Sequence, residues 1–155
     1  MPFSLYYGGM THEITVQEEL DLDHLKEVVS QFRRAIEACD QAHLPSAFQD
    51  FPAGACGDTA LLLAKFLEQS GFGHFDYVFG AQEGKTHAWL QKAHLVIDIT
   101  ADQFADVDQR VIVEYGSAWH TGFQEELSYV ADFENYGDDM RDEYRATYAR
   151  IYARL

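Results

Sequence analysis

The stretch FPAGACGDTALLLAKFL, residues 51–67, sets a glycine-containing turn directly before an unbroken apolar run. From Ala60 to Leu67 the apolar side chains point to nearly all sides of a helix, which is typical of a helix packed on most of its faces. The pair Ser70-Gly71 then provides an ordinary helix end. A helix buried on all sides must lie at the centre of a fold, so this stretch predicts a central helix surrounded by other elements.

The segment before this turn predicts an amphipathic helix that begins near Leu22. Its apolar residues recur at three- and four-residue steps through Ile36, and either Asp21 or Asp23 can cap its first turn. Cys39 continues the apolar stripe and is interpreted as a small hydrophobic residue packed in the core.

Strand patterns follow the central helix. We predict strands at 75–80, 86–91, 94–100 and 110–115, turns at 83–84 and 92–93, and a further strand or arm within 1–20. A face of apolar and aromatic residues between 140 and 155 predicts a last helix. The expected fold class is α+β, in which a central buried helix packs on an antiparallel sheet with flanking N- and C-terminal helices.

Length and charge limit the classes of partner. The chain has 155 residues, so we expect a single domain over 1–155. Its 26 acidic and 11 basic residues give a net charge of −15, which disfavours nucleic acid and membrane surfaces and permits a basic protein or peptide partner. Two cysteines form no disulfide framework, and the N-terminus does not resemble a signal peptide, so a cytoplasmic location is expected. Export by a leaderless route would leave the same sequence.

Cys56 stands at the start of the predicted central helix. The unpaired N–H groups and the positive end of the helix dipole favour a thiolate over a thiol there. The same N–H groups, including those of Cys56 and Gly57, can receive the negative oxygen of a tetrahedral intermediate. Cys56 is therefore a candidate nucleophile, with Gly57 at its oxyanion-binding site.

The predicted hairpin after this helix supplies a candidate base. With its turn at 92–93, His87 faces Asp98 across an antiparallel pair, close enough for the carboxylate to hold the imidazole. Trp89 shares that face and is expected to form a hydrophobic wall near the site. Cys56, His87 and Asp98 can then act as nucleophile, general acid–base and orienting carboxylate in acyl transfer through a thioester.

The segments GACGDTALLLAKFLEQSGF, THAWLQ and LVIDITADQF resemble the transglutaminase-like branch of the papain-like cysteine hydrolase superfamily. The resemblance covers about residues 50–104 and implies a papain/transglutaminase-like fold with Cys56, His87 and Asp98 as its catalytic triad. It also suggests Gln49, a short distance before the cysteine, as an oxyanion-hole donor, although this glutamine can equally be a solvated loop residue. No metal or cofactor is expected.

These observations predict a cysteine-dependent amide hydrolase or acyltransferase. Glutamine deamidation and peptide or isopeptide hydrolysis are favoured, because a compact domain offers little surface for a second amine substrate. The alternatives are transglutaminase-type acyl transfer and a catalytically silent acidic binding module on the same scaffold. The oligomeric state is not indicated.

Other interpretations of single residues also stay open. Cys56, His87 and Asp98 can be paired for structural reasons alone, or can bind zinc, whose ligand types they match. His120 is expected at the surface or in a loop, where it can border a cleft. Asp102 and Gln103 are expected to cap a turn or to line the pocket.

Overall fold

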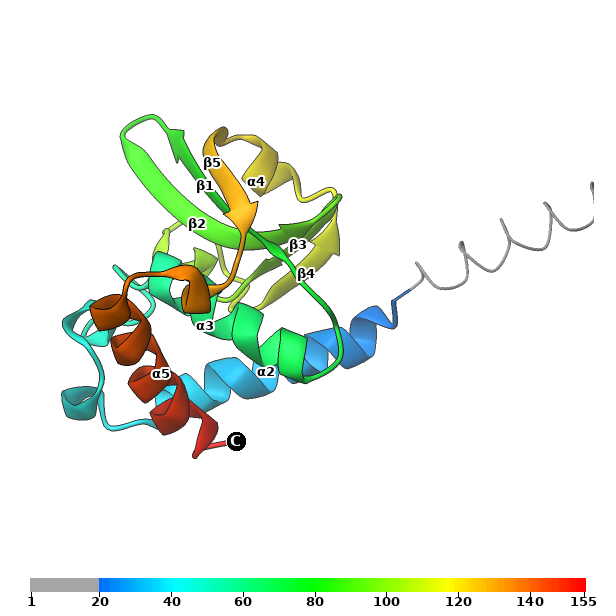
Figure 1. The fold of residues 1–155 in the computed structure, drawn as a ribbon. Coiled ribbons are helices and arrows are strands. Elements are labelled where there is room, and N and C mark those ends of the chain that lie inside the picture. Colours follow the sequence, from blue (N-terminus) through cyan, green and yellow to red (C-terminus); the bar gives the residue numbers. More distant parts are fainter. Residues whose placement is uncertain (1–19) are drawn as a thin grey trace, which may run out of the picture.

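A computed structural model describes residues 20–155, so the strand or arm predicted near the N-terminus lies outside the described residues. These residues form an antiparallel sheet in the order β4-β3-β2-β1-β5 together with several helices. In Figure 1, α3 runs along the sheet. Helices α2 and α5 lie on the side of α3 that faces away from the sheet. The fold class is α+β, as predicted. The helices are α2 Leu22–Ala38, α3 Cys56–Gln69, α4 Ala118–Thr121 and α5 Asp138–Tyr152, and the strands are β1 Asp76–Gln82, β2 Lys85–Lys92, β3 Leu95–Asp98, β4 Ile112–Tyr115 and β5 Gln124–Val130.

The predicted first helix is confirmed in α2. Asp21 caps it, accepting a hydrogen bond from the backbone N–H of His24 at 3.1 Å. Cys39 ends the helix half-buried and packs against the main core, with its Sγ 3.3 Å from the carbonyl oxygen of Ala35. Burial raises the pKa of the Cys39 thiol, which suits the predicted packing role.

The central helix is also confirmed, because α3 lies in the main core from its first turn to its last. It ends before Gly71, whose φ of 89° closes the helix in a conformation that glycine adopts without strain. None of the helices in residues 20–155 combines the length and apolar character needed to cross a membrane. The buried residues of α3 are Thr59, Ala60, Leu61, Leu62, Leu63, Ala64, Phe66 and Leu67.

The register of the second hairpin differs from the prediction. Lys92 pairs with Leu95, so the turn is formed by Ala93 and His94 rather than by Lys92 and Ala93. Ala93 adopts a φ of 52°, which a residue with a Cβ rarely takes, so the sequence does not mark it as a turn centre. The pairing is shifted by two residues, and Asp98 is therefore not directly opposite the predicted partner.

An even shift leaves every side chain on its predicted face of the sheet, because side chains alternate with a period of two. Trp89 and Val96 pack together on one face, whereas Leu95 and Ile97 belong to the main core on the other. The predicted grouping of residues by face is thus correct although the pairing is not.

Strand β5 was not predicted from the sequence. All seven of its side chains are exposed, so neither face of the strand needs apolar residues. Its sequence therefore lacks the alternation of apolar and polar residues by which a strand is predicted. The position of β5 is set by antiparallel pairing with β1, which runs from Asp76 opposite Val130 to Ala81 opposite Gln124. It forms one edge of the sheet.

A buried arginine fastens the segment after β3 to α2. The guanidinium of Arg33 donates to both carboxylate oxygens of Asp102, at 2.6 and 2.9 Å. It also donates to the carbonyl oxygens of Ile99 and Arg110, at 2.8 and 3.0 Å. Asp102 therefore anchors the loop that follows Asp98 instead of lining a pocket.

Replacing Asp102 with Ala should lower the free energy of unfolding by about 3 kcal/mol, because it removes the two closest carboxylate contacts of the buried Arg33 guanidinium. Urea denaturation measures this. A matched control is Glu27→Gln, which breaks the exposed pair with Arg34 and should change stability by less than about 1 kcal/mol. Equal effects of the two substitutions would contradict an anchoring role for Asp102.

Candidate active site

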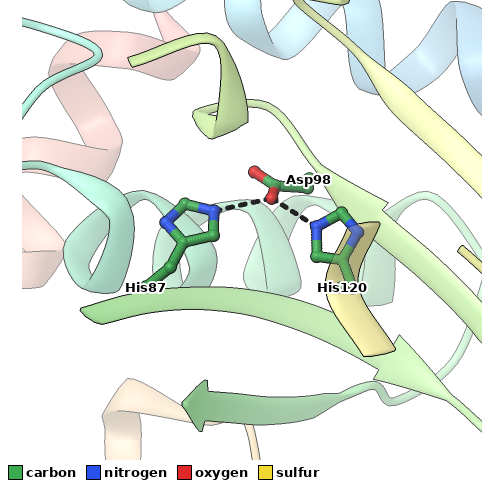
Figure 2. A group of neighbouring side chains, drawn as sticks. All are labelled: His87, Asp98 and His120. Carbon is green, nitrogen blue, oxygen red and sulfur yellow. Dashed lines mark hydrogen bonds and ion pairs between the residues drawn. The ribbon is translucent and has the colours of Figure 1, made fainter. Parts of the chain in front are cut away.

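The carboxylate of Asp98, at the end of β3, is the centre of the site (Figure 2). Its Oδ2 lies 2.7 Å from Nε2 of His87 on β2 and 2.7 Å from Nε2 of His120 on α4. Its Oδ1 accepts hydrogen bonds from the backbone N–H and the hydroxyl of Thr100, at 2.8 and 3.3 Å. All four residues are buried, so these donors replace the water that the carboxylate loses on folding.

These contacts fix the charge of the carboxylate. Burial alone would raise the pKa of Asp98, but hydrogen bonds from His120 and His87 hold it well below its usual range. Asp98 is therefore ionised at neutral pH, and Nε2 of His87 carries the hydrogen that it donates.

His87 is charged near neutral pH. Burial alone would lower its pKa, but the hydrogen bond to Asp98 and the negative charges of Asp98 and Cys56 raise it to about 9. Since Nε2 is bound to Asp98, Nδ1 is the ring nitrogen left for another partner. Gln103 lies on the same side, with its Nε2 3.5 Å from Nδ1 of His87, and so lines the site.

Cys56 is the first residue of α3 and carries a free, half-buried thiol. The residue before it is Ala55, and no side chain caps this helix, in contrast to the Asp21 cap of α2. The first-turn N–H groups of α3 are thus left for another hydrogen-bond acceptor. Gly57 keeps this end open, since a methyl group there would lie 3.0 Å from Oη of Tyr77.

Aromatic rings enclose His87. The rings of Phe104 and Trp119 meet it edge-on, with centroids 5.2 and 5.6 Å away. Trp89 is 6.0 Å away and buried, and its Nε1 donates to Gln91 Oε1 at 3.1 Å. Trp89 therefore lies beside His87, and its buried ring offers little surface for stacking on a substrate.

The chain matches no family model, no curated protein and no solved structure. Its chemistry is therefore inferred from the geometry of the site.

Gln49 requires a correction. Its side chain is exposed, and its amide nitrogen donates to the carbonyl oxygens of Gln41 and Leu44, at 2.6 and 3.4 Å. These bonds stabilise the loop before α3. We therefore assign Gln49 to that loop and not to an oxyanion hole.

His120 also differs from expectation. It is 2% exposed, not a surface residue, and its Nδ1 lies 2.6 Å from the hydroxyl oxygen of Ser117. His120 lies in a helix of four residues, next to Trp119. Such a helix is too short to show a periodic apolar pattern, so the sequence does not predict that His120 is buried. Its pairing with Asp98 depends on how α4 packs against β3.

The group His87, Asp98 and His120 has ligand types suited to a metal, with the ligand atoms within 4.8 Å of one another. However, each histidine nitrogen is 2.7 Å from Asp98 Oδ2, the length of a charge-assisted hydrogen bond. Two ligands of a tetrahedral zinc ion stand about 3.3 Å apart. Cys56 is not a member of this group. The alternative of a zinc site formed by Cys56, His87 and Asp98 is therefore not supported by the arrangement of residues 20–155.

The raised pKa of His87 predicts a pH-dependent contribution to stability. The contribution is complete below the unfolded value of 6.5 and is lost as the pH rises through about 9. The difference in unfolding free energy between the wild type and His87→Gln should therefore shrink by roughly 3 kcal/mol from about pH 6 to about pH 10. Urea denaturation across this range measures it.

The control is His43→Gln, which removes an exposed histidine. A difference between wild type and His87→Gln that stays constant with pH would contradict the charged state assigned to His87.

Proposed function

We propose that this protein is a cysteine-dependent acyl-transfer enzyme with a papain/transglutaminase-like fold and the triad Cys56, His87 and Asp98. One observation carries the proposal: Nε2 of His87 is held 2.7 Å from Asp98, and the negative charge of Cys56, at the uncapped start of α3, contributes to the raised pKa of His87. A structural pairing alone would not require a free thiol at that position.

The three residues would divide the reaction between them. The Cys56 thiolate attacks the carbonyl carbon of an amide, and the first-turn N–H groups of α3 receive the resulting oxyanion. His87 then gives its Nδ1 proton to the leaving amine, and a thioester forms on Cys56. His87 next takes a proton from water, which attacks the thioester and releases the acid.

Asp98 remains ionised throughout this cycle. Its Oδ2 holds the hydrogen on Nε2 of His87, which leaves Nδ1 available for the proposed proton transfer and favours the charged imidazole. His120 and Thr100 fix the carboxylate from other directions. General acid–base help of this kind contributes roughly 10²- to 10⁴-fold to the rate.

The proposed substrates are amides of proteins or peptides, either a glutamine side chain or a peptide or isopeptide bond. We favour hydrolysis over transfer to a second amine, because the compact domain offers little surface for a second substrate. The net charge of −15 would favour basic substrates over nucleic acid or anionic lipid.

The proposal predicts that iodoacetamide alkylates Cys56 well below the pH at which a free thiol, with a pKa of about 8.5, reacts. His87→Ala should remove this low-pH reaction, whereas His43→Ala should not, since His43 is exposed and its carboxylate neighbour is Asp40, not Asp98. Cys39 should react more slowly, because burial raises its pKa. Mass spectrometry of the alkylated peptides separates the two cysteines.

Reaction of Cys56 only above about pH 8 would remove the basis of the proposal. A binding module without activity would then be the better interpretation.

The reaction type is tested by incubating a cell lysate with the wild type or with Cys56→Ala. Deamidation should raise the mass of particular glutamine peptides by about one unit, because an amide nitrogen is replaced by oxygen. Proteolysis should yield new termini, and acyl transfer should yield crosslinked peptides. Any of these products must be absent with Cys56→Ala.

A further inference from the structure

Four tyrosines gather around the first turn of α3. Tyr77 on β1 reaches Gly57, and its ring stacks on that of Tyr129 on β5 with centroids 5.0 Å apart. Tyr136 meets the ring of Tyr144 edge-on, with centroids 5.8 Å apart. Since α3 begins at Cys56, the Tyr77 hydroxyl lies beside the residue that directly follows the proposed nucleophile.

The hydroxyl groups of this cluster differ in their partners. Tyr129 and Tyr136 are bonded to each other at 2.5 Å, and Tyr144 donates to Oδ1 of Asp58 at 2.6 Å. Tyr77 Oη has no hydrogen-bond partner among residues 20–155, although it lies beside the backbone of Gly57. Within the cluster, the Tyr77 hydroxyl is therefore the donor that lies beside the first turn of α3.

The Tyr77 hydroxyl keeps its proton at any pH at which the enzyme would work. Burial, and then the charges of Tyr129, Cys56 and Asp58, raise the pKa of Tyr77 to about 12. A neutral O–H near a thiolate can donate a hydrogen bond to charge that develops on a substrate oxygen.

We propose that Tyr77 is an oxyanion donor of the Cys56 reaction, in the place that the sequence suggested for Gln49. This inference rests on the proposed function. As the sulfur–carbon bond forms, the carbonyl π pair moves to oxygen, and Tyr77 Oη–H and a first-turn N–H of α3 donate to that oxygen. When the oxyanion returns its pair to carbon, the bond to the leaving group breaks and the leaving group departs with its electrons.

The test compares two reagents on Tyr77→Phe. p-Nitrophenyl acetate acylates a thiolate through an oxyanion, whereas iodoacetamide alkylates it by direct displacement without one. We expect Tyr77→Phe to slow the burst of p-nitrophenolate by at least about tenfold, towards the roughly 10²- to 10³-fold typical of a lost oxyanion donor. The pH profile of iodoacetamide alkylation should stay as in the wild type. Cys56→Ala gives the background acylation to subtract.

Tyr136→Phe is the matched control. It removes from the same cluster a hydroxyl group that is hydrogen-bonded to Tyr129. It should leave both reactions unchanged, and urea denaturation should show Tyr77→Phe to be folded. A wild-type burst that Tyr77→Phe retains in full would overturn the inference and leave the proposed function standing. Equal losses in acylation and alkylation would overturn it in favour of a structural role. A wild type with neither a burst nor low-pH alkylation would overturn both.

Discussion

The site depends on one buried carboxylate, that of Asp98. Such a group is stable away from water only when its oxygens are hydrogen-bonded. Here His87 from β2 and His120 from α4 donate to one oxygen, and the backbone and hydroxyl of Thr100 donate to the other. Because the donors come from different elements, the demand for hydrogen bonds also fixes those elements relative to one another.

The central helix imposes the second constraint. Its buried sides hold α3 in the main core, so its first turn must end at a defined place beside the sheet. No side chain caps that turn, and Cys56 and Gly57 stand there with the hydroxyl of Tyr77 at the edge. A helix end without a cap is less stable than a capped one, but its free N–H groups can bind an anion. The missing cap therefore fits the proposed binding of an oxyanion.

The sequence predicted the features that depend on local periodicity. The apolar run of α3, the Asp21 cap of α2 and the alternation along β2 and β3 all follow from side chains a few residues apart. The contact between His87 and Asp98 was expected for an incorrect reason, since the pairing is shifted by two residues. It survives because a shift of two keeps both side chains on one face and long side chains reach diagonally.

By itself, the sequence therefore determined the α+β class, the position of Cys56 at a helix start and the shared face of His87 and Asp98. Only the tertiary structure decided the contacts of Gln49, His120 and Tyr77, along with the existence of β5. Gln49 binds carbonyls of its own loop, and His120 reaches Asp98 from a four-residue helix. Such contacts do not recur at a regular spacing along the chain. They depend on how the elements pack in space, so the sequence shows no pattern from which to predict them.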